Sequence, residues 1–174
     1  MREPMPENGL DGARLRNGAS MELLVRTAKP GDLPAVLALY RQLNPDDPPL
    51  EPAPAQAVFD DILASPHFEL FVVEMAGDVV GTCYLNIVPN LSRGLSPYAV
   101  LENVVIEQRL RGRGIGQVVV RHALGRAWQC GCYKVMLMTG SRRESTHAFY
   151  RKCGFSSGDK FAFLARPPTE RGSP

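Results

Sequence analysis

Apolar residues along the chain form two patterns, and each pattern predicts one type of element. A short apolar stretch bounded by turn residues predicts a strand, and recurrence at every third or fourth position predicts a helix with one buried face. Strands are expected at residues 23–27, 70–75 and 79–87, from about Tyr98, at 133–139 and around 160–165. Helices are expected at residues 31–42, 55–65, 114–130 and 141–153. Residues 76–78, Ala-Gly-Asp, indicate a hairpin turn between the second and third of these strands.

Two segments without any period flank this patterned part. Residues 1–20 mix proline, glycine, asparagine and charged residues, a composition that cannot bury enough surface to order itself. Residues 167–174 have the same character. We therefore expect loose tails at both ends and one domain over residues 21–166. The 174 residues, 44% of them hydrophobic and 22% charged, are enough for one domain with a buried core.

Charge and cysteine usage remove several classes of function. Twenty Lys and Arg residues against 18 Asp and Glu residues give a net charge of +2, which does not favour a general attraction to nucleic acid or to a membrane. No stretch approaches the roughly 20 continuous apolar residues of a membrane span, and no secretory signal is seen, so the cytoplasm is the expected location. The four cysteines lack the paired spacing of a zinc site, so we expect no metal.

An arginine- and glycine-rich turn follows the apolar stretch at residues 101–106. Residues 109–116 read Arg-Leu-Arg-Gly-Arg-Gly-Ile-Gly, and an amphipathic helix is predicted directly after them. Glycines at a helix N-terminus expose backbone N–H groups, and arginines add charge, which together suit a phosphate. The turn matches neither a dinucleotide fingerprint nor a P-loop. A simple solvated turn, or a contact with RNA, are the alternatives to a phosphate site.

The predicted strand before this turn contains two polar residues, Glu102 and Asn103, in an otherwise apolar run. Burying an unsatisfied polar group costs on the order of 1–3 kcal/mol, so these side chains need partners, water or a function. For Glu102, a buried hydrogen bond or an ion pair with an arginine and a chemical function are equally open.

Residues 111–116, together with Phe149-Tyr150 and Gly154-Phe155 further on, resemble the GNAT superfamily of acetyl-CoA-dependent N-acetyltransferases. The resemblance covers about residues 98–155. Residues 131–134 and 149–155 are also similar to glucosamine-6-phosphate N-acetyltransferases, although those enzymes carry an aspartate in place of Met138 and an asparagine in place of Thr146. The resemblance implies an α/β domain of GNAT type, with a mixed sheet of six or seven strands and helices on both faces. It also suggests a homodimer.

The same resemblance implies how the site residues divide the work. Acetyl-CoA is the expected acetyl donor, and a primary amine of a small molecule is the expected acceptor. Tyr150 is expected to protonate the leaving thiolate, with Glu102 as the base. The residues expected to contact acetyl-CoA lie in the strand, the turn and the later helix: Val104, Val105, Ile106, Arg111, Gly112, Arg113, Gly114, Ile115, Gly116 and Thr146. A domain that binds acyl-CoA without turnover, as a sensor or scaffold, is the competing hypothesis.

Overall fold

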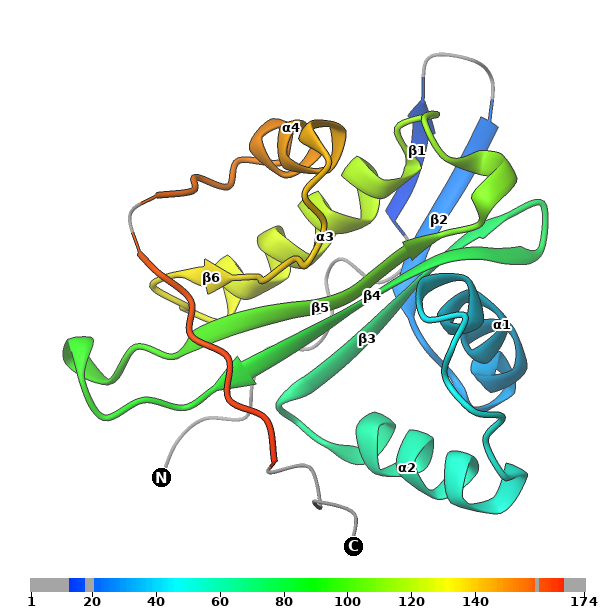
Figure 1. The fold of residues 1–174 in the computed structure, drawn as a ribbon, viewed down its shortest axis with the longest axis horizontal. Coiled ribbons are helices and arrows are strands. Elements are labelled where there is room, and N and C mark those ends of the chain that lie inside the picture. Colours follow the sequence, from blue (N-terminus) through cyan, green and yellow to red (C-terminus); the bar gives the residue numbers. More distant parts are fainter. Residues whose placement is uncertain (1–12, 18–20, 159, 168–174) are drawn as a thin grey trace, which may run out of the picture. The chain divides into compact units, whose positions relative to one another are not determined.

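The structure is a computed structural model of the chain and describes residues 13–17, 21–158 and 160–167 (Figure 1). The chain divides into two compact units, Met1–Leu137 and Met138–Pro174. The first unit holds the sheet and three helices, and the second holds one short helix and the chain that follows it.

One mixed sheet forms the centre of the first unit. Its strands lie in the order in which they occur in the chain, from β1 to β6. All neighbouring strands are antiparallel except β5 and β6, which are parallel. The predicted α/β class and mixed sheet are therefore confirmed. The strands are β1 (Ala13–Asn17), β2 (Met21–Thr27), β3 (Phe68–Met75), β4 (Asp78–Val88), β5 (Tyr98–Ile106) and β6 (Val135–Met136).

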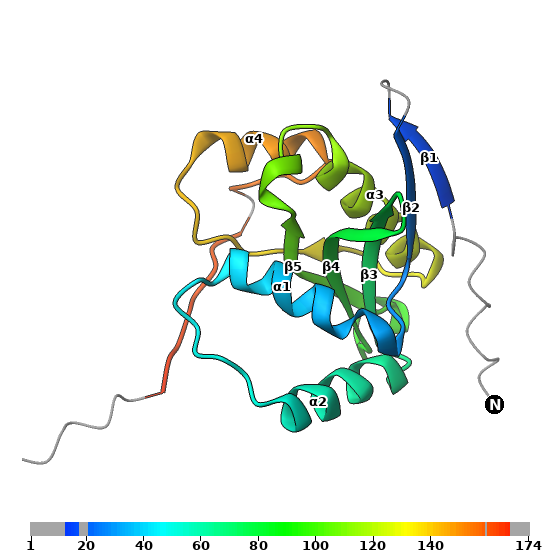
Figure 2. The same ribbon diagram turned by 90° about the vertical axis from the view of Figure 1, so that its right-hand side faces the viewer.

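Helices cover both faces of this sheet. Figure 2 shows α1 (Leu33–Leu43) and α2 (Pro52–Ala64) on one face and α3 (Ile115–Gln129) on the other. The first face holds a buried cluster of apolar side chains from α1, α2 and β3: Leu33, Val36, Phe59, Leu70 and Val72. The predicted periods placed these helices correctly because each helix buries one apolar stripe.

Every second residue of a strand points to the other face of the sheet, which α3 covers. Phe71 of β3 stacks edge-on against His122 of α3, with ring centroids 4.8 Å apart. Two residues before Phe71, Glu69 accepts the Arg126 Nε–H at 2.7 and 2.9 Å, and both side chains are buried. This ion pair fixes α3 on the sheet in one position.

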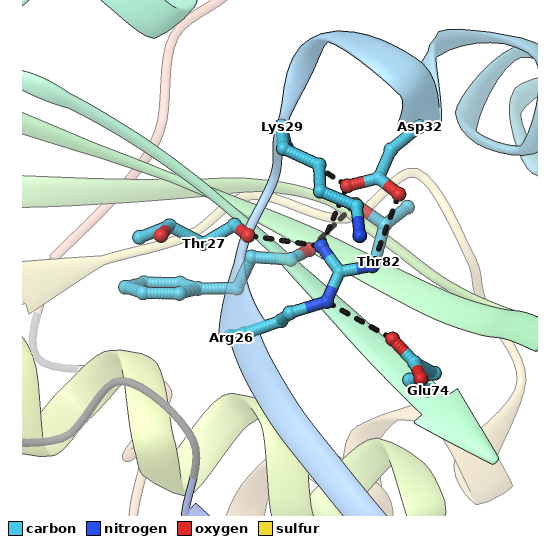
Figure 3. Close-up of polar contacts among 7 residues, drawn as sticks. Arg26, Thr27, Lys29, Asp32, Glu74 and Thr82 are labelled. Carbon is cyan, nitrogen blue, oxygen red and sulfur yellow. Dashed lines mark hydrogen bonds and ion pairs between the residues drawn. The ribbon is translucent and has the colours of Figure 1, made fainter. Parts of the chain in front are cut away.

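A second polar network holds the start of α1 (Figure 3). The Arg26 guanidinium donates to both carboxylate oxygens of Asp32, at 2.6 and 3.0 Å, and to Glu74 at 3.0 Å. The Lys29 backbone N–H also donates to Asp32, at 2.8 Å. Burial alone would raise the pKa of Asp32, but these hydrogen bonds outweigh it and hold that pKa below its usual 3.8. The network joins β2, β3 and α1.

Three expectations about element bounds are wrong. Residues 13–17, placed in the loose N-terminal tail, form β1, because the backbone groups at the edge of β2 can pair with any adjacent extended segment. The remaining residues of the segment 1–20 lie outside the described part. The strand predicted at 133–139 is only two residues long. The described residues 160–167 form no strand, so the last predicted strand is absent there.

The short helix of the second unit, α4 (Glu144–Lys152), begins three residues after the predicted start at residue 141. Its N-cap residue is Arg143, whereas the sequence Ser-Arg-Arg-Glu predicts a capping box that starts at Ser141. The Ser141 hydroxyl instead accepts the Arg143 backbone N–H at 3.3 Å, two residues on. A serine can make this local turn as readily as a cap, and the sequence does not distinguish them.

Candidate functional site

The C-terminal half of β5 has one unpaired edge in the described part of the chain. β6 pairs only with Ala99 and Val100, so the strand from Leu101 to Ile106 has β4 on one side and no strand on the other. The Ile106 carbonyl accepts a hydrogen bond from the Arg111 side chain. The other backbone N–H and C=O groups that point away from β4 can pair with an extended ligand that carries amides of its own.

A bulge interrupts the pairing of β5 with β4 at the same place. Thr82 pairs with Val105 and Tyr84 with Glu102, so two β5 residues, Asn103 and Val104, face the single residue between them. Asn103 has a φ of 49°, in the left-handed region that asparagine tolerates better than most residues. Because a bulge bends its strand, β5 turns at the point where its free edge begins.

Glu102 lies beside this bulge, directly opposite Tyr84. Opposed residues in an antiparallel pair share one face of the sheet, so Glu102 lies on the face that α1 and α2 cover. Its carboxylate is half-buried and forms no hydrogen bond or ion pair with any described residue. The alternative role of Glu102, a structural ion pair, therefore finds no arginine partner in the described part of the chain.

Two tyrosines lie near the bulge, Tyr84 opposite Glu102 and Tyr40 against Asn103. Burial raises the pKa of Tyr40 to about 12, and it also raises the pKa of Tyr84. The Tyr40 side chain, which comes from α1, interacts with the side chains of Asn103 and Thr82. Both phenols therefore stay protonated at neutral pH. Sequence reasoning missed both, because only the strand register and the packing of α1 bring them to the bulge.

The arginine- and glycine-rich turn follows β5 and leads into α3. Gly112 and Gly114 both have left-handed backbones, with φ of 78° and 81°, and Gly114 is the N-cap of the helix. The first helical hydrogen bonds run from Gln117 and Val118 to the Gly114 carbonyl. The N–H groups ahead of them have no acceptor within the helix, which makes this end of α3 suitable for an anion.

The side chains of the turn have different tasks. Ile115 is 1% exposed, so its side chain anchors the turn in the core while its backbone remains at the helix end. Arg111 donates from Nε to the Ile106 carbonyl at 2.9 Å, which ties the turn to the last residue of β5. Arg109 and Arg113 are exposed and add positive charge around the turn. The turn therefore combines a fixed backbone with exposed cations.

The other two predicted site residues lie in the second unit, on α4. Thr146 and Tyr150 are four residues apart and so lie on the same helix face. The Thr146 hydroxyl is hydrogen-bonded to the Ser141 hydroxyl at 3.1 Å. The Tyr150 ring packs edge-on against Phe149 and Phe155, with centroid distances of 4.9 and 6.0 Å. These rings hold the tyrosine in one orientation on the helix.

Other kinds of site find no support in the described residues. No group of three or more His, Cys, Asp or Glu side chains among them could hold a metal ion. Within the same residues, no helix is long and apolar enough to cross a membrane.

Comparison with known proteins gives a consistent result. The family described as Acetyltransferase (GNAT) family matches residues 36–155. Glucosamine 6-phosphate N-acetyltransferase 1 of Oryza sativa subsp. japonica is 30% identical over 159 residues, which cover 89% of this chain and 93% of that protein. A solved protein from Agrobacterium tumefaciens str. C58, whose name assigns it provisionally to the acetyltransferases, is 50% identical with a TM-score of 0.79. The match covers 82% of this chain and 99% of that one.

A structural neighbour from Arabidopsis thaliana, glucosamine-6-phosphate N-acetyltransferase, is 23% identical with a TM-score of 0.73. It is matched over 84% of this chain and 99% of its own. At this identity the likeness shows the fold alone.

Proposed function

Because this chain belongs to the acetyltransferase (GNAT) family and is an acetyl-CoA-dependent N-acetyltransferase, we propose that it acetylates the primary amine of a small molecule by direct attack. The observation that carries the proposal is the continuous sequence of free strand edge, bulge and left-handed glycine turn between Leu101 and Gly116. A ligand with an amide-bearing arm that ends in a pyrophosphate needs the strand edge first and the glycine turn after it.

The residues present fit acetyl-CoA. The helix-end N–H groups of Gly114, Ile115 and Gly116 suit the pyrophosphate, and Arg111, Gly112 and Arg113 complete the turn around it. The backbone of β5 suits the pantetheine amides, and the residues that offer it are Val104, Val105 and Ile106. When bound, acetyl-CoA supplies the acetyl group as an activated thioester. The Thr146 hydroxyl is assigned as a further contact.

The protein's own groups move the protons. An alkyl amine with a pKa near 10.4 is only about 0.1% neutral at physiological pH, a handicap of roughly 4 kcal/mol. Glu102, whose carboxylate has no partner in the described part of the chain, takes this proton directly or through water. The amine nitrogen then bonds to the acetyl carbon, the carbon–sulfur bond breaks, and the Tyr150 hydroxyl protonates the departing sulfur. The nitrogen loses its second proton, which restores the Tyr150 hydroxyl through water.

The proposed acceptor class is a small-molecule amine. Relatives of this chain are named for glucosamine 6-phosphate, an amino sugar with one amine. Two positions depart from the pattern of those enzymes. This chain has Met138, which is 60% exposed, where they carry an aspartate, and the Thr146 hydroxyl where they carry an asparagine amide. A panel of amines should therefore include glucosamine 6-phosphate and other amino sugars, both phosphorylated and not.

Calorimetric titration of acetyl-CoA tests the assigned turn. Gly114→Glu places a carboxylate at the helix end and should abolish binding. Gly131→Glu is the matched control, because Gly131 follows the other end of α3, is exposed and also has a left-handed φ of 72°. Equal loss in both variants would trace the effect to strain or charge alone and would remove the turn from the site.

The release of free CoA across the amine panel tests the catalytic assignments. Tyr150→Phe should lower kcat about 100-fold, within the range for loss of a general acid, while the Kd for acetyl-CoA stays unchanged. Full turnover of this variant at every pH would remove Tyr150 as the acid.

A further inference from the structure

The amide of Gln42, near the C-terminal end of α1, bridges two residues that lie 65 and 66 positions further along the chain. Its Nε2 donates to Glu107 Oε2 at 3.0 Å, and its Oε1 accepts the Gln108 backbone N–H at 2.9 Å. Both ends of one side-chain amide are therefore used on two consecutive residues. These residues directly follow β5 and begin the segment that leads to the glycine turn.

The bridged residues form the base of that turn. The Glu107 backbone N–H donates to the Val80 carbonyl at 2.9 Å, and the Glu107 carbonyl accepts the Leu110 N–H at 2.8 Å. The Arg111 N–H then donates to the Gln108 carbonyl at 3.3 Å. The path of the backbone from β5 to Gly112 is thus fixed from its first residue.

We propose that Gln42 is a positioning residue for the phosphate-binding turn, and that it sets the affinity for CoA from outside the site. This inference rests on the proposed function, because it takes the turn as the place where the pyrophosphate binds. The Gln42 amide holds Glu107 and Gln108, and through their backbone hydrogen bonds it fixes where the glycine turn and the N-terminus of α3 lie. Its proposed effect on CoA binding is transmitted through these backbone hydrogen bonds.

An amide is the group that this position requires. The Gln108 backbone N–H needs an acceptor, whereas the Glu107 carboxylate needs a donor, and a side-chain amide supplies both from one planar group. The other carboxylate oxygen of Glu107 faces Arg109, 3.7 Å from its Nε. Gln42 thus also keeps the Glu107 carboxylate turned toward α1.

Three variants and the titration of CoA test the proposal. Gln42→Leu removes both hydrogen bonds and should weaken CoA binding about tenfold, as expected for loss of a hydrogen bond to a charged group. Gln56→Leu is the matched control, because Gln56 is a helical glutamine on α2 that donates to the Asp60 carboxylate at 2.8 Å. It should lose a small amount of stability in urea and leave the Kd for CoA unchanged.

Gln42→Glu gives a readout that a merely structural role would not move. At pH 8 the introduced carboxylate repels Glu107, and CoA binding should be weaker than in the wild type. As the pH falls toward 5.5, the two carboxyl groups can share one proton, which restores a donor. The ratio of the variant's Kd to that of the wild type should then fall toward one, while the ratio for Gln42→Leu should stay constant.

The outcomes separate the two proposals. If the wild-type protein binds CoA and Gln42→Leu binds it with the same Kd, the positioning role is overturned and the proposed function stands. Absence of CoA binding to the folded wild-type protein would overturn the proposed function, and this inference would fall with it. An equal loss of affinity in Gln56→Leu would show a general effect of stability and would also overturn the positioning role.

Discussion

Gly81 of β4 lies where a methyl group would collide with the last residue of β5. A Cβ built on Gly81 would lie 2.5 Å from the Ile106 Cδ1 atom and 3.2 Å from the Val105 carbonyl oxygen. Gly81 and Ile106 are paired in the sheet, one residue before the segment that carries the glycine turn. Gly81→Ala therefore tests how tightly the end of β5 is packed.

The expected cost follows from the contact distances. Two methyl carbons normally approach to about 3.5–4.0 Å, so one of them must move by about 1–1.5 Å. Overpacking of this kind costs about 1–3 kcal/mol, and exchanging glycine for alanine in a strand returns about 0.5–1 kcal/mol. Gly81→Ala should therefore lower the free energy of unfolding by about 1 kcal/mol and by at most about 2.5 kcal/mol, which lowers Tm by at most about 10 °C for a chain of this length.

A double-mutant cycle isolates the collision. Ile106→Val removes the Cδ1 atom and alone should cost about 0.5–1.5 kcal/mol. In the double variant the added methyl occupies the space of the removed one, so its unfolding free energy should lie within about 1 kcal/mol of the wild type. Urea denaturation measures all four proteins. The control cycle uses Val73→Ala, because the Val73 Cγ2 atom would lie at an ordinary 3.5 Å from the added methyl and should give no rescue.

Additive losses in the Gly81→Ala and Ile106→Val cycle would refute this reasoning. In that case the double variant would be less stable than either single variant, and the Ile106 side chain would not be the obstacle. The tight backbone contact at the Val105 carbonyl would then carry the cost, and β5 itself would have to shift.

Three further perturbations follow from the described contacts. Arg126→Met leaves the buried Glu69 carboxylate without its partner and should cost about 3–5 kcal/mol, whereas also changing Glu69→Leu should recover most of that loss in urea denaturation. Asp32→Asn should flatten the acid limb of the stability curve. The depressed pKa of Asp32 gives stability above about pH 4 that is lost as pH falls through the folded pKa. Glu102→Gln should lower kcat about 100-fold at pH 7, and less at high pH where the amine is already neutral.

Each of these has an outcome that contradicts it. A double variant at Glu69 and Arg126 as unstable as Arg126→Met would show that the ion pair is not the source of the loss. An acid unfolding midpoint of Asp32→Asn equal to that of the wild type would remove the linkage to Arg26. A Glu102→Gln variant whose deficit is the same at every pH would assign the carboxylate a role other than that of a base.

Much of the fold follows from local patterns that the sequence carries. Short apolar runs placed β2, β3 and β4, and the helical period placed α1 and α3, because the strands lie in the core and each helix buries one stripe. The glycine turn was also predictable, since left-handed residues and helix-end donors depend on a few consecutive residues. The departures lie where an element has little apolar pattern, at β1, or where a pattern finds no partner, at residues 160–165.

The arrangement around Glu102 depended on the tertiary structure. The sequence by itself determined that a carboxylate interrupts an apolar strand before an anion-binding turn. Only the register of β4 against β5, with its bulge at Asn103, decided that Tyr84 opposes Glu102. Only the packing of α1 decided that Gln42 reaches Glu107. Periodicity records which side of an element is buried, and it holds no information about which distant segment covers that side.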